Sequence, residues 1–284
     1  MLDTPIAPTR RAYECLQVRR DGGVLHVTLD RPEARNAMTM GMLRELRTVL
    51  TEAQADGDVR VIVLRGAGGH FCAGADLKDM AAARARAGTA DDRERHVEPA
   101  PDPMAEVNAR FGELCVAYAS TGIATVAVLE GTVMGGGFGL ACVVDVAIAA
   151  DNAVFRLPET SLGVVPAQIA PFLVERLGYA EAKRLAVTGG RVYAAQALQL
   201  RLVHEVHAAE ALDAALQRVL HEILQGAPGA ISATKALLAQ ARFTPPAAMV
   251  PHAAAAFSRS AQGPEGIEGT AAFLGKRKPK WAPS

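Results

Sequence analysis

The sequence predicts an α/β fold in which βα units are followed by a helical C-terminal region. Three observations predict it. Short apolar strands alternate with helical patterns up to residue 159, and glycine-rich loops follow two of these strands. From residue 168 onward the pattern is helical and is broken by glycine and proline. The chain has 284 residues, half of them apolar, which is enough for a substantial core.

The first βα unit is predicted from residues 24 to 66. VLHVTLD at 24–30 alternates like a strand. Residues 40–56 place Met42, Leu43, Leu46, Val49, Leu50 and Ala53 on one face, as an amphipathic helix does, and Gly57 is suited to end it. VRVIVLRG at 59–66 is almost wholly apolar, which is typical of a buried parallel strand.

A second unit follows. A helix is expected near 103–121, then a strand at 125–131, a glycine loop and an apolar helix, with further strands at 146–150 and 153–159. Residues 79–102 are charged and rich in Ala and Arg. We interpret this segment either as a partly mobile flap beside a site or as a solvated insertion.

Charge and cysteine content exclude several function classes. Lys+Arg and Asp+Glu both number 30, so no global field attracts nucleic acid or an anionic membrane. No apolar stretch of about 18 residues occurs, and the first residues lack the apolar part of a signal peptide. The cysteines are scattered without zinc-site spacing. We therefore expect reduced thiols, no metal, no membrane contact and a cytoplasmic location.

Two glycine loops, GAGGHFCAGADLKDM at 66–80 and GTVMGGGFGLA at 131–141, each follow an apolar strand and open a helix. The first N–H groups of a helix have no partner within it, so two facing loops can hold one oxygen between them. Nucleotide-phosphate motifs are excluded, because no Lys follows the glycines and Leu140 replaces the last glycine of GxGxxG. Tight packing against a neighbouring helix remains an alternative for either loop alone.

At this point the sequence resembles a known family. LDRPEARNAMT, FCAGADLKDM, GGGFGLACVVDVAIA, FRLPETSLGVVP and AAFLGKRKPKW look, in this order, like the crotonase superfamily of enoyl-CoA hydratases and isomerases. The resemblance covers about residues 16 to 281. Within 133–178 it is closest to branched glutaconyl-CoA hydratases, such as isohexenylglutaconyl-CoA or methylglutaconyl-CoA hydratase.

The resemblance implies a crotonase-like core of repeated ββα units, which we assign to residues 1–200. It implies a helical region at 201–284 that builds homotrimers or hexamers and closes the pocket. The implied substrate is an acyl-CoA thioester. Coenzyme A is then part of the substrate, and no separate cofactor is expected.

The catalytic residues follow from motif matches. The backbone N–H groups of Ala75 and Gly136 would form an oxyanion hole for the thioester oxygen. Hydratases of the family typically carry two glutamates: Glu159 matches the second, and the first falls on Gly139. Capping the next helical turn is the alternative role for Glu159. Asp76 is expected to fix its loop rather than to perform chemistry.

The resemblance also assigns the coenzyme A site. The backbone of residues 73–76 would surround the adenine and pantetheine, with Arg35 and Lys78 near phosphates. The binding residues within one chain are expected to be Arg35, Ala73, Gly74, Asp76, Leu77, Lys78, Gly135 and Gly139. Phe273 and Lys276 from a neighbouring subunit would close the adenine pocket; otherwise the tail is only a solvated basic end.

Three functions remain open from the sequence. The first is hydration of a 2-enoyl-CoA, with room at Gly139 for a bulky or branched acyl chain. The second is Δ3–Δ2 enoyl-CoA isomerisation, for which one carboxylate is sufficient. The third is a catalytically weak relative that binds acyl-CoA or RNA; the balanced charge argues against RNA, because nucleic-acid affinity depends mainly on phosphate neutralisation.

Overall fold

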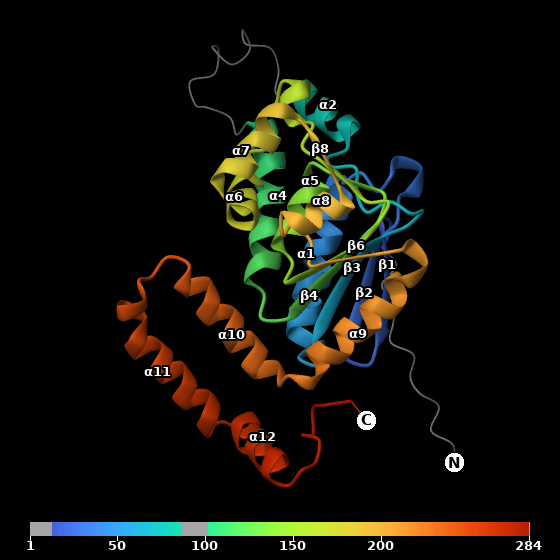
Figure 1. The fold of residues 1–284 in the computed structure, drawn as a ribbon. Helices are drawn as coiled ribbons and strands as arrows, with labels where there is room; N and C mark the ends of the chain where they lie inside the picture. The colour runs from blue at the N-terminus through green and yellow to red at the C-terminus, as the bar shows by residue number, and fades with distance from the viewer. Residues whose placement is uncertain (1–12, 87–101, 284) are drawn as a thin grey trace, which may run out of the picture.

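The computed structural model describes residues 13–86 and 102–283. Within these residues the strands form a main sheet of six and a small sheet of three (Figure 1). The main sheet has the order β1-β2-β3-β4-β6-β9, comprising Leu16–Asp21, Val24–Leu29, Val61–Gly66, Ala124–Leu129, Val146–Ala150 and Glu205–His207. Its strands pair in parallel except for β1 with β2. The small sheet joins β5 (Thr132–Met134), β7 (Val154–Arg156) and β8 (Arg191–Tyr193).

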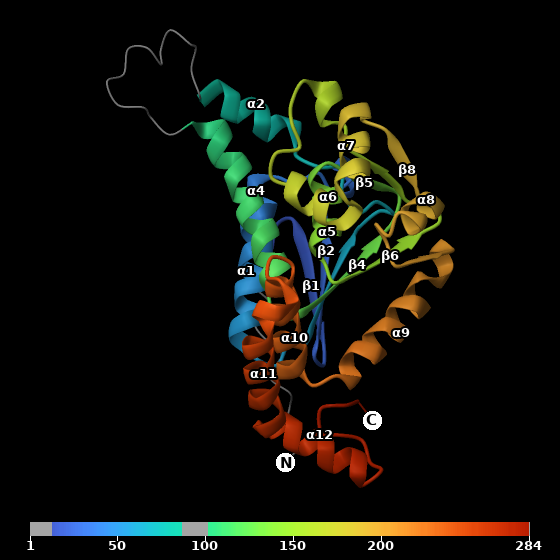
Figure 2. The same ribbon diagram turned by 60° about the vertical axis from the view of Figure 1, so that its left-hand side comes forward.

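Helices cover both faces of the main sheet (Figure 2). On one face lie α1 (Met40–Asp56), α4 (Pro103–Ser120) and α5 (Gly136–Val143), and on the other lies α9 (Leu212–Gln225). The strand side chains alternate between two cores accordingly: Ile62 and Leu64 pack towards α1, whereas Val61 and Val63 pack towards α9. The predicted α/β class is therefore confirmed.

Most expected elements are present. The helix predicted at 40–56 is α1, capped by the Thr39 side chain and ended by Gly57 in the left-handed conformation. Strands β1, β5, β8 and β9 were not predicted, and the last three of these are only three residues long. Of the charged segment at 79–102, residues 79–86 belong to α2 (Leu77–Arg86), whereas 87–101 lie outside the described residues.

The C-terminal half contains α6 (Ala170–Leu177), α7 (Tyr179–Thr188) and α8 (Ala194–Gln199), followed by β9 and α9 on the main sheet. Helices α10 (Pro228–Ala241), α11 (Pro246–Gln262) and α12 (Pro264–Leu274) project away from the sheet as an arm (Figures 1 and 2). Its exposed apolar side chains are Leu238, Phe243, Val250, Phe257, Ile267, Phe273 and Leu274. The helical C-terminal region is thus confirmed; the domain boundary near residue 200 stays a prediction.

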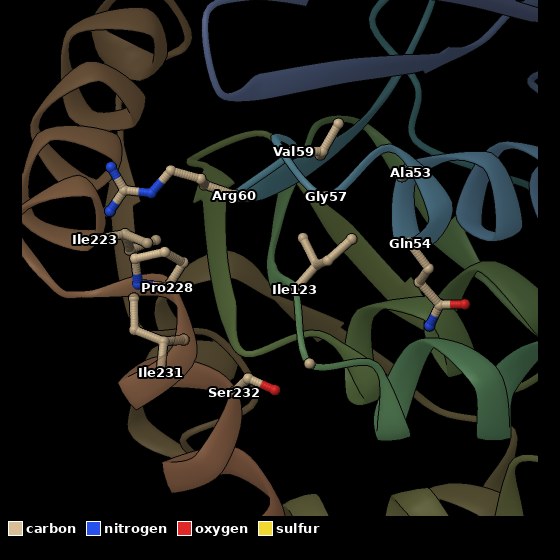
Figure 3. A pocket seen from close by; sticks show the side chains of 11 residues that line it. Ala53, Gln54, Gly57, Val59, Arg60, Ile123, Ile223, Pro228, Ile231 and Ser232 are labelled. Carbon is tan, nitrogen blue, oxygen red and sulfur yellow. The ribbon is translucent and has the colours of Figure 1, made fainter. Parts of the chain in front are cut away.

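Arg60 joins this arm to the core. Its guanidinium donates to the carbonyl oxygens of Leu224 (2.9 Å), Gly226 (2.6 Å) and Trp281 (2.6 Å). The side chain borders a hollow of about 250 Å³ between α1, α9 and α10 (Figure 3). This hollow lies at the amino ends of β3 and β4, whereas the two glycine loops follow the carboxyl ends of these strands. In parallel α/β sheets ligands bind at the carboxyl ends.

Candidate active site

The two glycine loops lie side by side. Cys72 forms a parallel bridge with Val133: Cys72 N–H donates to Thr132 O (2.9 Å), and Met134 N–H donates to Cys72 O (2.9 Å). This pairing places Gly74 in contact with the glycine triplet at 135–137. Gly74 has φ 96°, a backbone conformation that favours glycine, and a β-carbon there would lie only 3.1 Å from Met134 O, so glycine permits this approach without crowding.

Two backbone N–H groups are left free at this junction. Gly136 is the first residue of α5, where the helix provides no acceptor for its N–H. Beside Ala75, Met38 N–H donates to Gly74 O and Asp76 N–H donates to Met38 O, which leaves the Ala75 N–H outside the ladder. Within the described residues neither Ala75 N–H nor Gly136 N–H donates a hydrogen bond. The structure therefore brings the two predicted donors to adjacent loops.

Glu159 lies beside Gly135, the residue that precedes the second donor. It begins a 3-10 helix, η2 (Glu159–Leu162), and its Oε1 would be 3.1 Å from a β-carbon on Gly135. Oε2 is buried and has no hydrogen-bond partner in the part of the chain that the structure describes. Burial raises the pKa of the Glu159 carboxyl above its ordinary value. A carboxylate with a raised pKa is a better proton acceptor than an exposed glutamate.

The position of the first family glutamate is closed by apolar side chains. A β-carbon on Gly139 would lie 2.3 Å from Ile169 Cγ2 and 3.3 Å from Phe111 Cζ. The expectation that Gly139 leaves room for an acyl chain is therefore wrong, because the side chains of Ile169 and Phe111 already fill this space. Sequence reasoning missed both residues, since neither belongs to a glycine loop.

A hollow of about 480 Å³ adjoins the first loop. Of the predicted binding residues, Ala73, Asp76, Leu77 and Lys78 line it, together with the predicted oxyanion donor Ala75. Four lining residues were not predicted: Arg31, Glu33, Ala34 and Ala37. They lie in the motif LDRPEARNAMT, so the sequence signal for them was present but was not assigned to a pocket.

Asp76 holds the wall of this hollow in place. Its carboxylate accepts from Arg31 Nη1 and from the Lys78 N–H, both at 2.9 Å. Burial opposes ionisation here, but the hydrogen bonds from the Lys78 N–H and from Arg31 hold the pKa of Asp76 below its ordinary value. These contacts order the loop that carries Ala75.

Other predicted residues lie outside the hollow. Arg35 has an exposed side chain, and its backbone carbonyl accepts from Ala73 N–H at 2.9 Å. Gly74 and Gly135 form the contact between the loops rather than a pocket wall. Phe273, 83% exposed, and Lys276 lie at the end of the arm; within one chain they are far from α2 and the hollow (Figure 1).

Comparison with known proteins decides the family. The model of the family described as enoyl-CoA hydratase/isomerase matches residues 19–284. The chain belongs to this family. A crystal structure of an enoyl-CoA hydratase/isomerase from Marinobacter aquaeolei is 46% identical, with a TM-score of 0.88 over 95% of this chain and 100% of that chain.

One relative of this chain is named as a hydratase and another as an isomerase. "Probable enoyl-CoA hydratase 2, mitochondrial" from Arabidopsis thaliana is 31% identical over 91% of this chain and 81% of its own. "Delta(3,5)-Delta(2,4)-dienoyl-CoA isomerase, peroxisomal" from the same plant is 28% identical over 96% and 99%. The chain is thus an enzyme of hydratase or isomerase type. No helix in the described part of the chain combines the length and apolar character needed to cross a membrane.

Proposed function

We propose that this enzyme adds water across the 2,3 double bond of an acyl-CoA thioester, with Glu159 as the sole catalytic carboxylate. One observation carries the proposal. Glu159 is half-buried, and its Oε2 is buried and unpartnered among the described residues. Its carboxylate lies beside Gly135, one residue before Gly136.

The backbone donors stabilise the charge that the reaction develops. When a hydroxyl group adds to C3, electrons move onto the thioester oxygen and form an enolate. The Ala75 and Gly136 N–H groups bind this oxygen, and each such donor contributes about 2.7–4 kcal/mol in comparable oxyanion holes. Gly136 begins a helix, so the positive end of the helix dipole adds to this effect.

Glu159 acts first as the base that accepts a proton from water and then as the acid that donates it to the substrate. Its carboxylate removes a proton from water as the water oxygen bonds to C3, and the resulting carboxylic acid returns that proton to C2 of the enolate. One molecule of water is consumed and the carboxylate is regenerated. A raised pKa suits this cycle, because a more basic carboxylate accepts the proton more readily.

The test is to incubate the protein with linear and branched 2-enoyl-CoA thioesters. We expect the absorbance of the conjugated thioester to fall and ¹⁸O from labelled water to appear at C3. Glu159→Gln should lower kcat by about 100-fold or more, the usual contribution of a positioned general base. Unchanged turnover in Glu159→Gln, or no turnover of any 2-enoyl-CoA, would refute the proposal.

A Δ3–Δ2 isomerase is the second candidate, favoured by the apolar side chains that replace a second carboxylate at Gly139. In that reaction Glu159 would remove a proton from Cα to give a dienolate, whose oxygen is bound by the same two N–H groups, and would return the proton to Cγ. A 3-enoyl-CoA would then become a conjugated 2-enoyl-CoA without gaining solvent oxygen. The ¹⁸O measurement separates the two reactions.

Coenzyme A binding is proposed for the hollow beside α2. Lys78 lines it and Arg35 lies on an adjoining exposed turn, so both are candidates for the phosphates. Phe273 and Lys276 of a second copy would close the adenine end, which requires a homotrimer or hexamer. The exposed apolar side chains of α10–α12 support self-association, and sedimentation should give a multiple of 29.8 kDa.

Substrate branching and location are further parts of the proposal. A branched acyl group rests on the resemblance of residues 133–178 to branched glutaconyl-CoA hydratases, and the substrate panel tests it. A cytoplasmic location is likewise a proposal, and cell fractionation tests it. We propose no cofactor besides the coenzyme A of the substrate, and no nucleic-acid or membrane partner.

A further inference from the structure

Three apolar side chains from distant parts of the sequence cover the first turn of α5. A β-carbon on Gly136 would lie 2.3 Å from Met38 Cε and 3.2 Å from Phe111 Cζ. A β-carbon on Gly139 would lie 2.3 Å from Ile169 Cγ2 and 3.3 Å from the same Phe111 atom. Positions three apart share one face of a helix, so these contacts form one continuous apolar wall.

The wall is rigid at Ile169. This residue is 2% exposed, and its carbonyl accepts from Leu173 N–H (2.9 Å) as α6 begins. Isoleucine is branched at Cβ, which restricts its χ1 rotation. The atom nearest to Gly139 is Cγ2, bonded directly to Cβ, and Cβ itself would lie 3.3 Å from the added carbon. The clash therefore cannot be relieved by moving the end of a long side chain.

We infer that Ile169 and Phe111 determine both the number of carboxylates in the site and its acyl specificity. This inference rests on the proposed function. Ile169 excludes any side chain at position 139, so the enzyme works with Glu159 alone. An acyl chain whose carbonyl oxygen is bound at Gly136 N–H meets Phe111 and Ile169 within one helical turn. The wall selects acyl groups that are apolar on the side facing Gly139.

The steric part of the inference is tested by stability. Gly139→Ala should lower Tm, although alanine favours a helix more than glycine does. In the double variant with Ile169→Ala, Tm should fall by less than the sum of the two single losses, because removing the Ile169 side chain also removes the clash. Gly41→Ala is the matched control: it also lies in a helix, but its added carbon finds Thr39 Oγ1 only at 3.4 Å and should not lower Tm. A Gly139→Ala protein as stable as the parent, or losses that simply add, would overturn the inference.

The specificity part is tested by kinetics. We compare kcat/KM for linear and for branched or bulky enoyl-CoA thioesters in the parent and in Ile169→Ala. The ratio should move by about tenfold or more towards the bulkier substrate, as expected when a pocket loses methyl or methylene groups. Ile148→Ala removes an equally buried side chain from β6 and should destabilise the protein without changing the ratio. An unchanged ratio in Ile169→Ala would overturn this part.

The two proposals fail separately. If the parent protein turns over no 2-enoyl-CoA, the hydratase proposal is lost, but the stability coupling between positions 139 and 169 still decides whether the wall excludes a side chain. If hydration is observed but the Tm losses of the Gly139 and Ile169 variants are additive, the hydratase proposal stands. The inference about the apolar wall is then wrong.

Discussion

The carboxylate of Glu159 lies against Gly135, whose absent side chain would begin 3.1 Å from Glu159 Oε1. Gly135 has φ 50°, which places it in a region that side-chain-bearing residues rarely adopt. Gly135 therefore forms the turn before α5, and its missing side chain leaves the space beside the Glu159 carboxylate open.

Replacing Gly135 tests this relationship. Gly135→Ala should cost about 1–3 kcal/mol of stability through its positive φ. It should also lower kcat, because the new methyl group crowds Glu159. The control is Gly22→Ala, in the turn between β1 and β2, which has a similar φ of 55° but open space around the added carbon. The control should lose stability while keeping its kcat; an equal loss of kcat in both variants would contradict the relationship.

The pH dependence of activity should reflect the raised pKa of Glu159. If Glu159 must be ionised to accept a proton, kcat/KM falls as pH decreases through that pKa. Burial raises the pKa, so this fall should begin at a higher pH than an exposed glutamate would give. A pH–rate profile measures it, and the residual rate of Glu159→Gln should lack the same limb. An acid limb at the ordinary carboxyl pKa would contradict the effect of burial.

The same shift predicts a pH-dependent effect on stability. The folded protein binds the Glu159 proton more tightly than the unfolded chain, so ionisation of Glu159 destabilises the fold as pH rises. Glu159→Gln should therefore raise Tm above the folded-state pKa. Below the ordinary glutamate pKa this gain should vanish, since both states are then protonated. A gain in Tm that is independent of pH would point to another cause.

The Asp76–Arg31 ion pair should favour coenzyme A binding, because it holds the loop at 73–78 in place beside the hollow. Asp76→Asn weakens the hydrogen bonds to Arg31 and to the Lys78 N–H. We expect a larger KM and, because the same contacts order the loop that carries Ala75, a lower kcat as well. Because its folded-state pKa is lowered, Asp76 contributes stability above the ordinary carboxyl pKa and loses it as pH falls through the lowered value. Asp21→Asn, in an exposed pair with Arg19, is the control and should leave KM unchanged.

Arg60 should stabilise the base of the arm. Arg60→Ala leaves three carbonyl groups without their donor, and we expect a loss of about 1–3 kcal/mol in the free energy of unfolding. Arg19→Ala is the control, because its ion pair is exposed and 3.6 Å long; it should change stability by less than about 0.5 kcal/mol. Chemical denaturation measures both. Equal stabilities would show that the arm does not depend on Arg60.

Elements with strong local patterns were predictable. The helix at 40–56 repeats its apolar residues at helical spacing, and the strand at 59–66 is continuously apolar. Strands β5, β8 and β9 were not predictable. Each has three residues, which is too short for a recognisable periodicity, and the strand that it pairs with lies far along the chain.

The motifs of the sequence determined the family and the two glycine loops. They also predicted Glu159 as the remaining carboxylate and Gly139 in place of the other. Only the tertiary structure decided what occupies the space beside Gly139 and which residues form the hollow beside α2. Met38, Phe111 and Ile169 come from three separate segments, and Arg31 reaches Asp76 across 45 positions of sequence. Local residue patterns encode secondary structure, whereas the volume around a side chain is set by packing between segments that the sequence does not show as neighbours.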